Sequence, residues 1–173
     1  MPWRAGFGRA YAPFAANGLH HDVVFGGSGK LGFPANALLA VAMGADMIGV
    51  AREPMLAIGC IQALRCHDGH CPTGVTTHNK WLTRGLDPTD KATRLANYIT
   101  GLRGEMLKLA HACGVVHPAL VTSDMIEFFD EPQRSTTATA RYGLNAEIEC
   151  LSDAQRQSIE AEMRDLARNT VTH

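Results

Sequence analysis

In the first sixty residues, segments whose hydrophobic and polar pattern predicts a helix are followed by segments whose pattern predicts a strand. We expect a helix over residues 9–17 and a strand over residues 22–25 that runs into a glycine-rich loop. A second helix over residues 35–43 and a second strand over residues 46–50 follow, and Ala51 leads into a third helix. This order of strand, loop and helix predicts parallel βα units in an α/β fold.

The second half of the chain is predicted to be mostly helical. Asp87 is placed to cap a long helix that begins at Pro88 and ends before a glycine. The apolar positions that share one face of this helix are Leu95, Ile99, Leu102, Met106, Leu109 and Cys113. Residues 130–141, rich in Ser and Thr, are predicted to be a flexible linker. Ser152 has capping-box spacing to Gln155, which predicts the start of a last helix.

The pattern divides the chain into three parts. Residues 1–129 hold the βα units and the long helix, residues 130–150 the linker, and residues 151–173 the last helix. Two βα units are too few to close a (β/α)8 barrel, which typically needs about 250 residues. We therefore expect the chain to be a piece of a larger fold.

Composition and charge narrow the classes of protein. Of the 173 residues, 46% are hydrophobic and 19% charged, and the formal net charge is −1. These values are typical of a soluble globular protein, and the chain has no excess of positive charge that would indicate binding to nucleic acid or an anionic membrane. No apolar run reaches the ~20 residues of a transmembrane helix, and the first residues lack the apolar core of a secretory signal. We expect a cytoplasmic protein.

Three of the five cysteines lie within twelve residues and form the strongest chemical signal. Cys60, Cys66 and Cys71 have the spacing C-x5-C-x4-C and are followed by a proline. If the preceding helix continues through Cys60, one thiolate lies near its end and two lie in the following loop. Three thiolates on a short segment suit an iron–sulfur cluster, with three irons or with four irons and one exchangeable corner.

Two other interpretations of this segment remain open. His67 or His70 could join two or three of the cysteines around a structural zinc ion, which prefers four sulfur and nitrogen ligands. The thiols could also simply be packed in a cysteine-rich loop. We assign no ligand role to Cys113, which lies on the apolar stripe, or to Cys150.

Two loops that follow the predicted strands are candidates for an anion site. The first contains Ser28, Gly29 and Lys30, and the second runs from Gly49 to Arg52. Glycine lets the backbone approach a phosphate closely, and the two basic side chains would add positive charge. In βα barrels the loops after the last two strands commonly bind phosphate. Ordinary turns at strand ends would have the same composition.

Taken together, several segments resemble the FMN-binding glutamate synthase family. They are Gly29-Lys-Leu-Gly-Phe-Pro34, Gly44-Ala-Asp-Met47, Ala51-Arg52, Cys60-Ile-Gln-Ala-Leu-Arg-Cys66 and Cys71-Pro-Thr-Gly-Val-Thr-Thr77. The resemblance is strong over residues 22–79 and looser to about residue 129. The most specific part is the cysteine spacing followed by Pro-x-Gly-Val.

The resemblance implies a fold, two cofactors and a reaction. The expected fold is the C-terminal part of a (β/α)8 barrel, in which residues 22–25 and 46–50 are the seventh and eighth strands. The expected cofactors are FMN and a [3Fe–4S] cluster, and the reaction forms L-glutamate from 2-oxoglutarate and ammonia derived from glutamine. By the same resemblance, the cluster ligands are Cys60, Cys66 and Cys71, within a cluster loop over residues 60–79. The residues at the flavin phosphate are Ser28, Gly29, Lys30, Gly49, Ala51 and Arg52.

The sequence departs from the larger glutamate synthases in both loops. In the first loop their sequence is similar to Gly-Gly-Leu, where this chain has Gly29-Lys30-Leu31. In the second loop it is similar to Gly-Phe-Gly-Thr, where this chain has Gly49-Val-Ala-Arg52. Both changes match a smaller, single-domain branch of the family. No catalytic acid or base can be named. The partners implied are an electron-donor protein or the remaining barrel segment, and the alternative is a truncated, non-catalytic fragment that binds a cluster or zinc.

Overall fold

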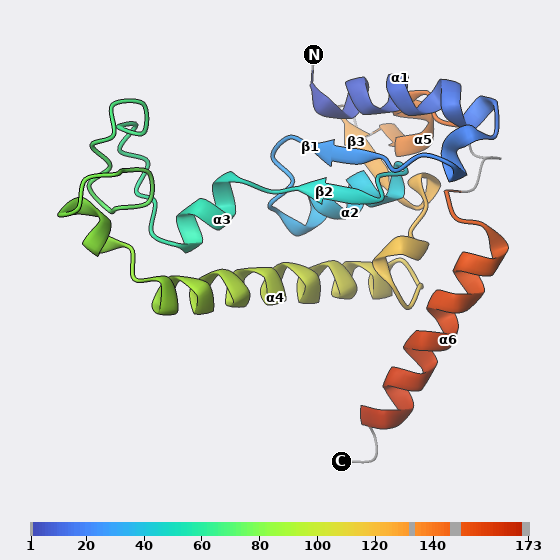
Figure 1. Cartoon of the computed structure of the whole chain (residues 1–173). Helices are drawn as coiled ribbons and strands as arrows, with labels where there is room; N and C mark the ends of the chain where they lie inside the picture. The colour runs from blue at the N-terminus through green and yellow to red at the C-terminus, as the bar shows by residue number, and fades with distance from the viewer. Residues whose placement is uncertain (1, 132–133, 146–149, 171–173) are drawn as a thin grey trace. The chain divides into compact units, whose positions relative to one another are not determined.

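The computed structural model describes residues 2–131, 134–145 and 150–170, and its architecture is α/β with small sheets. The chain divides into two compact units. The first unit combines residues 1–49 with residues 105–173, and the second unit contains residues 50–104. Figure 1 shows the elements of each unit.

The first unit contains a parallel and an antiparallel sheet. Strand β1 (Gly26–Ser28) pairs in parallel with β2 (Met47–Gly49), in direct register from the first residue of each to the last. Strand β3 (Glu127–Asp130) pairs antiparallel with β4 (Arg134–Thr137). Among the described residues, each sheet has two strands.

Helices and 3-10 turns accompany these strands in the first unit. Those of the first unit are α1 (Trp3–Ala16), α2 (Pro34–Ala42), α5 (Ala138–Tyr142) and α6 (Asp153–Thr170), with 3-10 turns η1 (Leu19–His21), η3 (Pro118–Leu120) and η4 (Ser123–Met125). Helix α1 contacts both β1 and α5 (Figure 1). An aromatic cluster holds α1 to the segment before β1, because the ring of Phe25 lies 4.9 Å from that of Tyr11 and 5.3 Å from that of Phe14.

The core of the first unit is built around α2, which is apolar on every side and is therefore suited to a central position. One group of buried side chains consists of Leu38, Ala42, Ala110 and Val121. A second group consists of Leu39, Met43 and Ala138. The partly buried side chain of Cys113 packs against the first group, so this thiol serves as a small hydrophobe, as its place on the apolar stripe predicts.

The second unit consists of α3 (Arg52–Ala57), a long loop, η2 (Leu82–Gly85) and the first part of α4 (Pro88–Ala112). The predicted cap of α4 is confirmed, because the Asp87 carboxylate accepts a hydrogen bond from the Thr89 amide at 3.0 Å. None of the helices in the described ranges combines the length and the hydropathy needed to cross a membrane.

Several predicted elements are confirmed. Helix α2, strand β2 and helix α6 lie where the sequence places them. The capping box is present, because the Ser152 amide donates to Gln155 Oε1 at 2.9 Å and the Gln155 amide donates to Ser152 Oγ at 3.4 Å. On α4, the predicted stripe is buried at Leu102 and Met106, whereas Leu95 is exposed.

The predicted position of the first strand is wrong. Residues 22–25 form no strand, and β1 instead begins at Gly26, inside the predicted loop. The β-propensity of Val23 and Val24 is overridden because both side chains are exposed. Bonding to β2 starts at the end of this segment, where the Phe25 carbonyl accepts a hydrogen bond from the Met47 amide at 3.2 Å. Gly27 packs closely on α2 and the residues after it, since a Cβ there would lie 3.9 Å from the Cβ of Ala40 and 3.4 Å from the Cβ of Ala45.

The predicted flexible linker is also corrected. Residues 130–141 include strand β4 and most of helix α5. Ser and Thr suit a loop in isolation, but here the Ser135 hydroxyl donates to Glu127 Oε2 across the hairpin at 2.5 Å. Thr137 caps α5 through a hydrogen bond from the Ala140 amide to its side chain. The division into parts 1–129, 130–150 and 151–173 stays a prediction.

Candidate functional site

The first candidate loop follows β1 and is fixed by helices α1 and α2. Lys30 is exposed and adopts a left-handed conformation, with φ 58°. Its carbonyl accepts a hydrogen bond from Asn36 Nδ2 at 3.1 Å, and Asn36 Oδ1 accepts one from Arg4 at 2.5 Å. Gly29 has φ 145°, and a Cβ there would lie 2.8 Å from the Trp3 side chain. Packing against Trp3 by itself therefore requires glycine at position 29.

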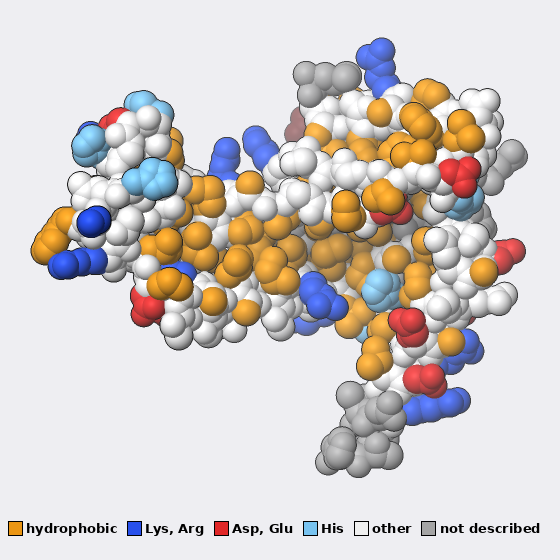
Figure 2. All heavy atoms as spheres, viewed as in Figure 1, with side chains coloured by type: hydrophobic (Ala, Val, Ile, Leu, Met, Phe, Trp, Pro, Cys, Tyr) orange, Lys and Arg blue, Asp and Glu red, His pale blue; other side chains and the backbone are white. Residues whose placement is uncertain are grey.

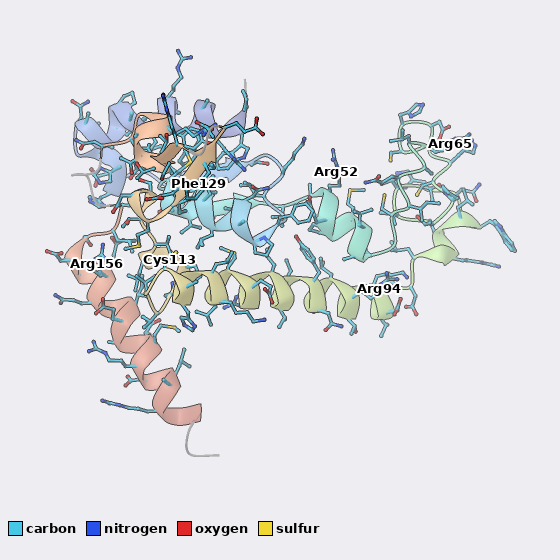
Figure 3. All side chains as sticks on the ribbon, turned by 180° about the vertical axis from the view of Figure 1, so that it is seen from behind. Arg52, Arg65, Arg94, Cys113, Phe129 and Arg156 are labelled. Carbon is cyan, nitrogen blue, oxygen red and sulfur yellow. The ribbon has the colours of Figure 1, made fainter. Side chains whose placement is uncertain are left out.

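The second candidate loop begins beside the first. Ser28 and Gly49 are register partners at the ends of β1 and β2, and a Cβ on Gly49 would lie 3.2 Å from Ser28 Oγ. The parallel pairing therefore brings these two predicted flavin-site residues together at one edge of the sheet. Ala51 and Arg52 belong to the second unit, where Ala51 precedes α3 and Arg52 is its exposed first residue (Figure 3).

The cluster loop, residues 60–79, starts where α3 ends. The helix stops at Ala57 and does not continue through Cys60, which the sequence left open, because Gly59 takes φ 106° and breaks the helical path. The Cys60 amide donates to the Met55 carbonyl at 2.9 Å, and the Cys60 sulfur accepts a hydrogen bond from the Gln62 amide at 3.4 Å. Cys60 thus lies in the loop itself.

The outer part of the cluster loop is exposed and carries basic and histidine side chains (Figures 2 and 3). Cys66 is exposed. Arg65 Nε donates to Asp68 Oδ2 at 2.8 Å, and the His70 amide donates to Asp68 Oδ1 at 2.9 Å. The His70 amide is the main reason that the pKa of Asp68 is lowered, with Arg65 adding to it. The Asp68 carboxylate therefore stays charged and holds this part of the loop.

The inner part of the loop is a turn built on Cys71. The Cys71 carbonyl accepts a hydrogen bond from the Gly74 amide at 3.3 Å, with Pro72 at the second position of the turn, which suits its fixed φ. Gly74 has φ 79°, and a Cβ there would lie 2.5 Å from the Leu82 carbonyl oxygen. The Thr77 hydroxyl donates to the Gly69 carbonyl and closes the loop behind the turn.

The Cys71 sulfur is buried in a polar environment that favours the thiolate. The hydroxyl of Thr73 lies 3.4 Å from the sulfur and is the main cause of a pKa lowered to about 6. The amides of Thr76 and Thr73 and the Thr76 hydroxyl lower the pKa further, whereas burial opposes them. A thiolate at neutral pH is the form that binds metal.

The three predicted cluster ligands are thiols, as an iron–sulfur cluster requires, but they are not gathered at one point. All three cysteines carry free thiols. In the ranges that the structure describes, no group of three or more His, Cys, Asp or Glu side chains is gathered to hold a metal ion, which applies equally to zinc at His67 or His70. Binding would therefore require Cys60 and Cys66 to move toward Cys71.

Sequence reasoning missed the two threonines that act on Cys71. They lie in the segment Cys71-Pro-Thr-Gly-Val-Thr-Thr77, which resembles the family but to which we assigned no role for the threonine hydroxyls. The signal in the sequence is that several hydroxyl-bearing residues follow the cysteine directly.

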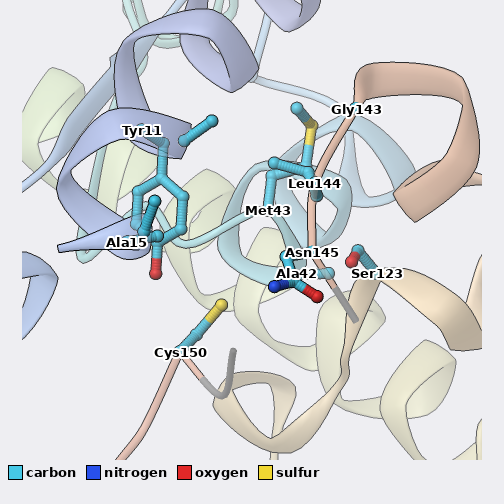
Figure 4. Close-up of a pocket in the computed structure, with 11 residues that line it drawn as sticks. Tyr11, Ala15, Ala42, Met43, Ser123, Gly143, Leu144, Asn145 and Cys150 are labelled. Atoms are coloured by element: carbon cyan, nitrogen blue, oxygen red, sulfur yellow. The ribbon is translucent and has the colours of Figure 1, made fainter. Parts of the chain in front are cut away.

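A cavity of about 240 Å³ in the first unit was also not predicted. Tyr11, Met43, Ser123, Asn145 and Cys150 are among the residues that line it (Figure 4). Burial and the neighbouring Cys150 raise the pKa of Tyr11, so its hydroxyl stays protonated.

Comparison with known proteins identifies related sequences. Residues 1–116 match the family described as the conserved region in glutamate synthase. The glutamate synthase large subunit-like protein YerD of Bacillus subtilis is 36% identical over 114 residues, which cover 66% of this chain and 22% of that protein. The NADPH glutamate synthase large chain of the same organism is 31% identical over 116 residues, which cover 66% of this chain and 7% of that protein.

The likeness extends beyond residue 116 in another relative. The ferredoxin-dependent glutamate synthase 2 of Arabidopsis thaliana is 27% identical over 99% of this chain and 12% of its own length. The chain thus spans less than a quarter of the length of these three relatives.

Proposed function

Because this chain belongs to the glutamate synthase family, we propose that it forms part of an oxidoreductase that makes L-glutamate from 2-oxoglutarate and nitrogen from ammonia or glutamine. The observation that carries the proposal is the turn at Cys71, whose buried sulfur is surrounded by donors in a loop with two further free thiols. We place the protein in the cytoplasm, where a reducing environment keeps such thiols free.

The proposed site has two parts. Cys60, Cys66 and Cys71 would hold a [3Fe–4S] cluster, and Ser28, Gly29, Lys30, Gly49, Ala51 and Arg52 would hold the FMN phosphate. When bound, these groups supply one-electron transfer and hydride transfer to the imine of 2-oxoglutarate. The chain's own contribution is to bind and orient them, with positive charge from Lys30 and the Ser28 hydroxyl beside the strand ends.

The proposed architecture is the C-terminal portion of a (β/α)8 barrel. In it β1 and β2 are the last two strands, and a further polypeptide segment supplies the remaining strands. A separate protein partner would donate the electrons. A second candidate is a non-catalytic fragment that binds a cluster or zinc. The two-stranded parallel sheet favours it, because two strands supply no wall for a flavin ring.

An assay of metal and sulfide tests the proposal. Protein purified and reconstituted without oxygen is expected to contain iron and acid-labile sulfide in near-equal amounts. Cys66→Ser should remove both, because the cluster loses a thiolate ligand. Cys113→Ser is the matched control and should leave them unchanged, since Cys113 packs in the core of the first unit. Stoichiometric zinc without sulfide would overturn the cluster assignment and support the second candidate.

A further inference from the structure

The first candidate loop is held at two neighbouring residues by the first turn of α1. Gly29 packs against the Trp3 side chain, since a Cβ there would lie 2.8 Å from it. Arg4 Nη2 donates a hydrogen bond at 2.5 Å to Oδ1 of Asn36, which lies in the first turn of α2. Asn36 Nδ2 in turn donates to the Lys30 carbonyl at 3.1 Å. Two helices therefore hold the backbone of the two residues that follow β1.

Arg4 determines which way the amide group of Asn36 faces. A guanidinium group only donates hydrogen bonds, so the Asn36 oxygen faces Arg4, and the Asn36 NH2 group faces the Lys30 carbonyl. Arg4 is itself half-buried and lies over the ring of Phe128 in β3, 5.9 Å from the ring centroid, which is within the range of a cation–π contact. The donor of Asn36 is therefore oriented by the fold before any ligand binds.

The hydrogen bond from Asn36 falls on a residue whose backbone conformation is unfavourable. Lys30 has φ 58°, and a residue with a Cβ adopts this left-handed conformation only at a cost in free energy. Without a donor to its carbonyl, Lys30 would return to a backbone conformation with negative φ, and its exposed side chain would point elsewhere. A loop that adopts its binding conformation for only part of the time binds its ligand more weakly in the same proportion.

We propose that Asn36, oriented by Arg4, holds Lys30 in the left-handed conformation and thereby gives the first candidate loop a preference for a phosphorylated flavin. The inference rests on the proposed function, in which this loop binds the FMN phosphate. Asn36 and Arg4 are positioning residues, because they act on the phosphate through Lys30. Riboflavin is the matched ligand, since it has the ring and the ribityl chain of FMN and lacks the phosphate. The affinity for FMN relative to riboflavin therefore measures the contribution of the loop.

Fluorescence titration of the full chain with FMN and with riboflavin tests the proposal. Asn36→Ala is expected to weaken FMN binding about fivefold, the effect of one ordinary hydrogen bond, and to leave the affinity for riboflavin unchanged. In a Lys30→Gly background, Asn36→Ala should have little further effect, because glycine adopts the left-handed conformation without a partner. Asn17→Ala is the matched control. It removes an amide that donates to the Pro13 carbonyl at 2.7 Å near the end of α1 and should change neither affinity.

Variants of Arg4 test the orientation of the amide. Arg4→Met removes the donor to Asn36 Oδ1 and should weaken the binding of FMN but not of riboflavin. Arg4→Lys keeps a donor and should restore part of the preference for FMN. These two variants decide the question if Asn36→Ala does not fold. Loss of the preference in Arg4→Met with recovery in Arg4→Lys supports the inference, and a preference that is unchanged in Arg4→Met overturns it.

The outcomes separate this inference from the proposed function. A wild-type chain that binds FMN no more tightly than riboflavin overturns both the phosphate role of the loop and the inference. A wild-type chain that prefers FMN, with the same preference in Asn36→Ala, overturns the inference and leaves the phosphate role standing. If Asn36→Ala weakens the binding of FMN and riboflavin equally, Asn36 has only a structural role, which also overturns the inference.

Discussion

Lys30 combines an exposed positive charge with a backbone conformation that suits glycine. Its φ of 58° is left-handed, and non-glycine residues pay about 1 kcal/mol or more for that conformation. The larger glutamate synthases resemble Gly-Gly-Leu at this loop, where this chain has Lys30 at the second position. Glycine would adopt this conformation without strain, and we propose that the charge of the lysine serves the FMN phosphate.

Substitutions at Lys30 separate charge from strain. In the complete barrel, Lys30→Glu is expected to weaken FMN binding, because a carboxylate then lies beside the phosphate. Lys30→Gln keeps the strained backbone and removes only the charge, so its FMN affinity should fall between those of the wild type and Lys30→Glu. Flavin fluorescence titration measures the three affinities. Equal affinities would exclude a phosphate role for this loop.

The thiol of Cys71 should titrate at unusually low pH in the metal-free protein. Its pKa is lowered to about 6, chiefly by the Thr73 hydroxyl. The thiolate therefore dominates above pH 6 and the unreactive thiol below it. Alkylation by iodoacetamide, followed at Cys71 by mass spectrometry, should show a midpoint near this value, and Thr73→Val should move the midpoint upward. A midpoint near the usual value of about 8.5 would contradict the donor arrangement.

Among the elements, the turn from Cys71 to Gly74 is sensitive to a single methyl group. Gly74→Ala should destabilise the second unit, because the left-handed backbone costs about 1–3 kcal/mol and the new Cβ would lie 2.5 Å from the Leu82 carbonyl oxygen. Gly69→Ala is a matched control, since Gly69 has φ 71° but nothing within 4 Å of the added Cβ.

Denaturant unfolding of the two variants measures the difference. Gly69→Ala should lose only this backbone contribution of about 1–3 kcal/mol, and Gly74→Ala clearly more. Equal losses in the two variants would mean that the packing of the turn against η2 contributes nothing to stability.

Elements with strong local signals were predictable from the sequence. The caps at Asp87 and Ser152 fixed the starts of α4 and α6, because a side chain two or three residues away satisfies the first free amides. Strand β1 was misplaced because Gly27 packs closely on Ala45 and on Ala40 of α2, contacts between separate segments that propensity does not register. The hairpin of β3 and β4 was missed for the same reason, since its Ser and Thr side chains pair across strands.

For the candidate site, the sequence indicates residue types, whose roles stay predictions, but not their geometry. The cysteine spacing indicates metal chemistry, and the predicted order of parallel βα units agrees with the strand pairing that brings Ser28 to Gly49. The sequence does contain the signal that places Cys60 beyond the end of α3, because Gly59 directly before it suits a left-handed helix end. It could not separate the threonine that faces Cys71 from the one that closes the loop on Gly69.

At the scale of the whole molecule, the exposed parts of the first unit indicate incompleteness. Parallel sheets are normally buried on both faces and continued at both edges. Here Met47 of β2 is 62% exposed, and Val24 and Phe33, which flank β1 and its loop, are 67% and 61% exposed. In the chain these residues precede, belong to or follow the two strands of the parallel sheet, and the strands added in the proposed barrel would cover them.

The chain alone is therefore expected to lack glutamate synthase turnover. Without further strands a flavin has no wall to hold its ring at reacting distance, and positioning contributes much of the rate. The measurement is glutamate formation from 2-oxoglutarate and ammonia, after reconstitution with FMN, iron and sulfide. Size-exclusion chromatography should show self-association through the open strand edges. Turnover by a monomer would contradict the proposed barrel.

The small parallel sheet also sets how quickly its amide protons exchange with deuterated water. Each strand of β1 and β2 has three residues, and in the described chain each pairs on one side only. Amides on the unpaired sides should exchange within the time of local opening rather than that of global unfolding. Addition of a further strand would slow the exchange of these amide protons. Hydrogen exchange at β1 and β2 would therefore report assembly of the sheet in the absence of any cofactor or turnover.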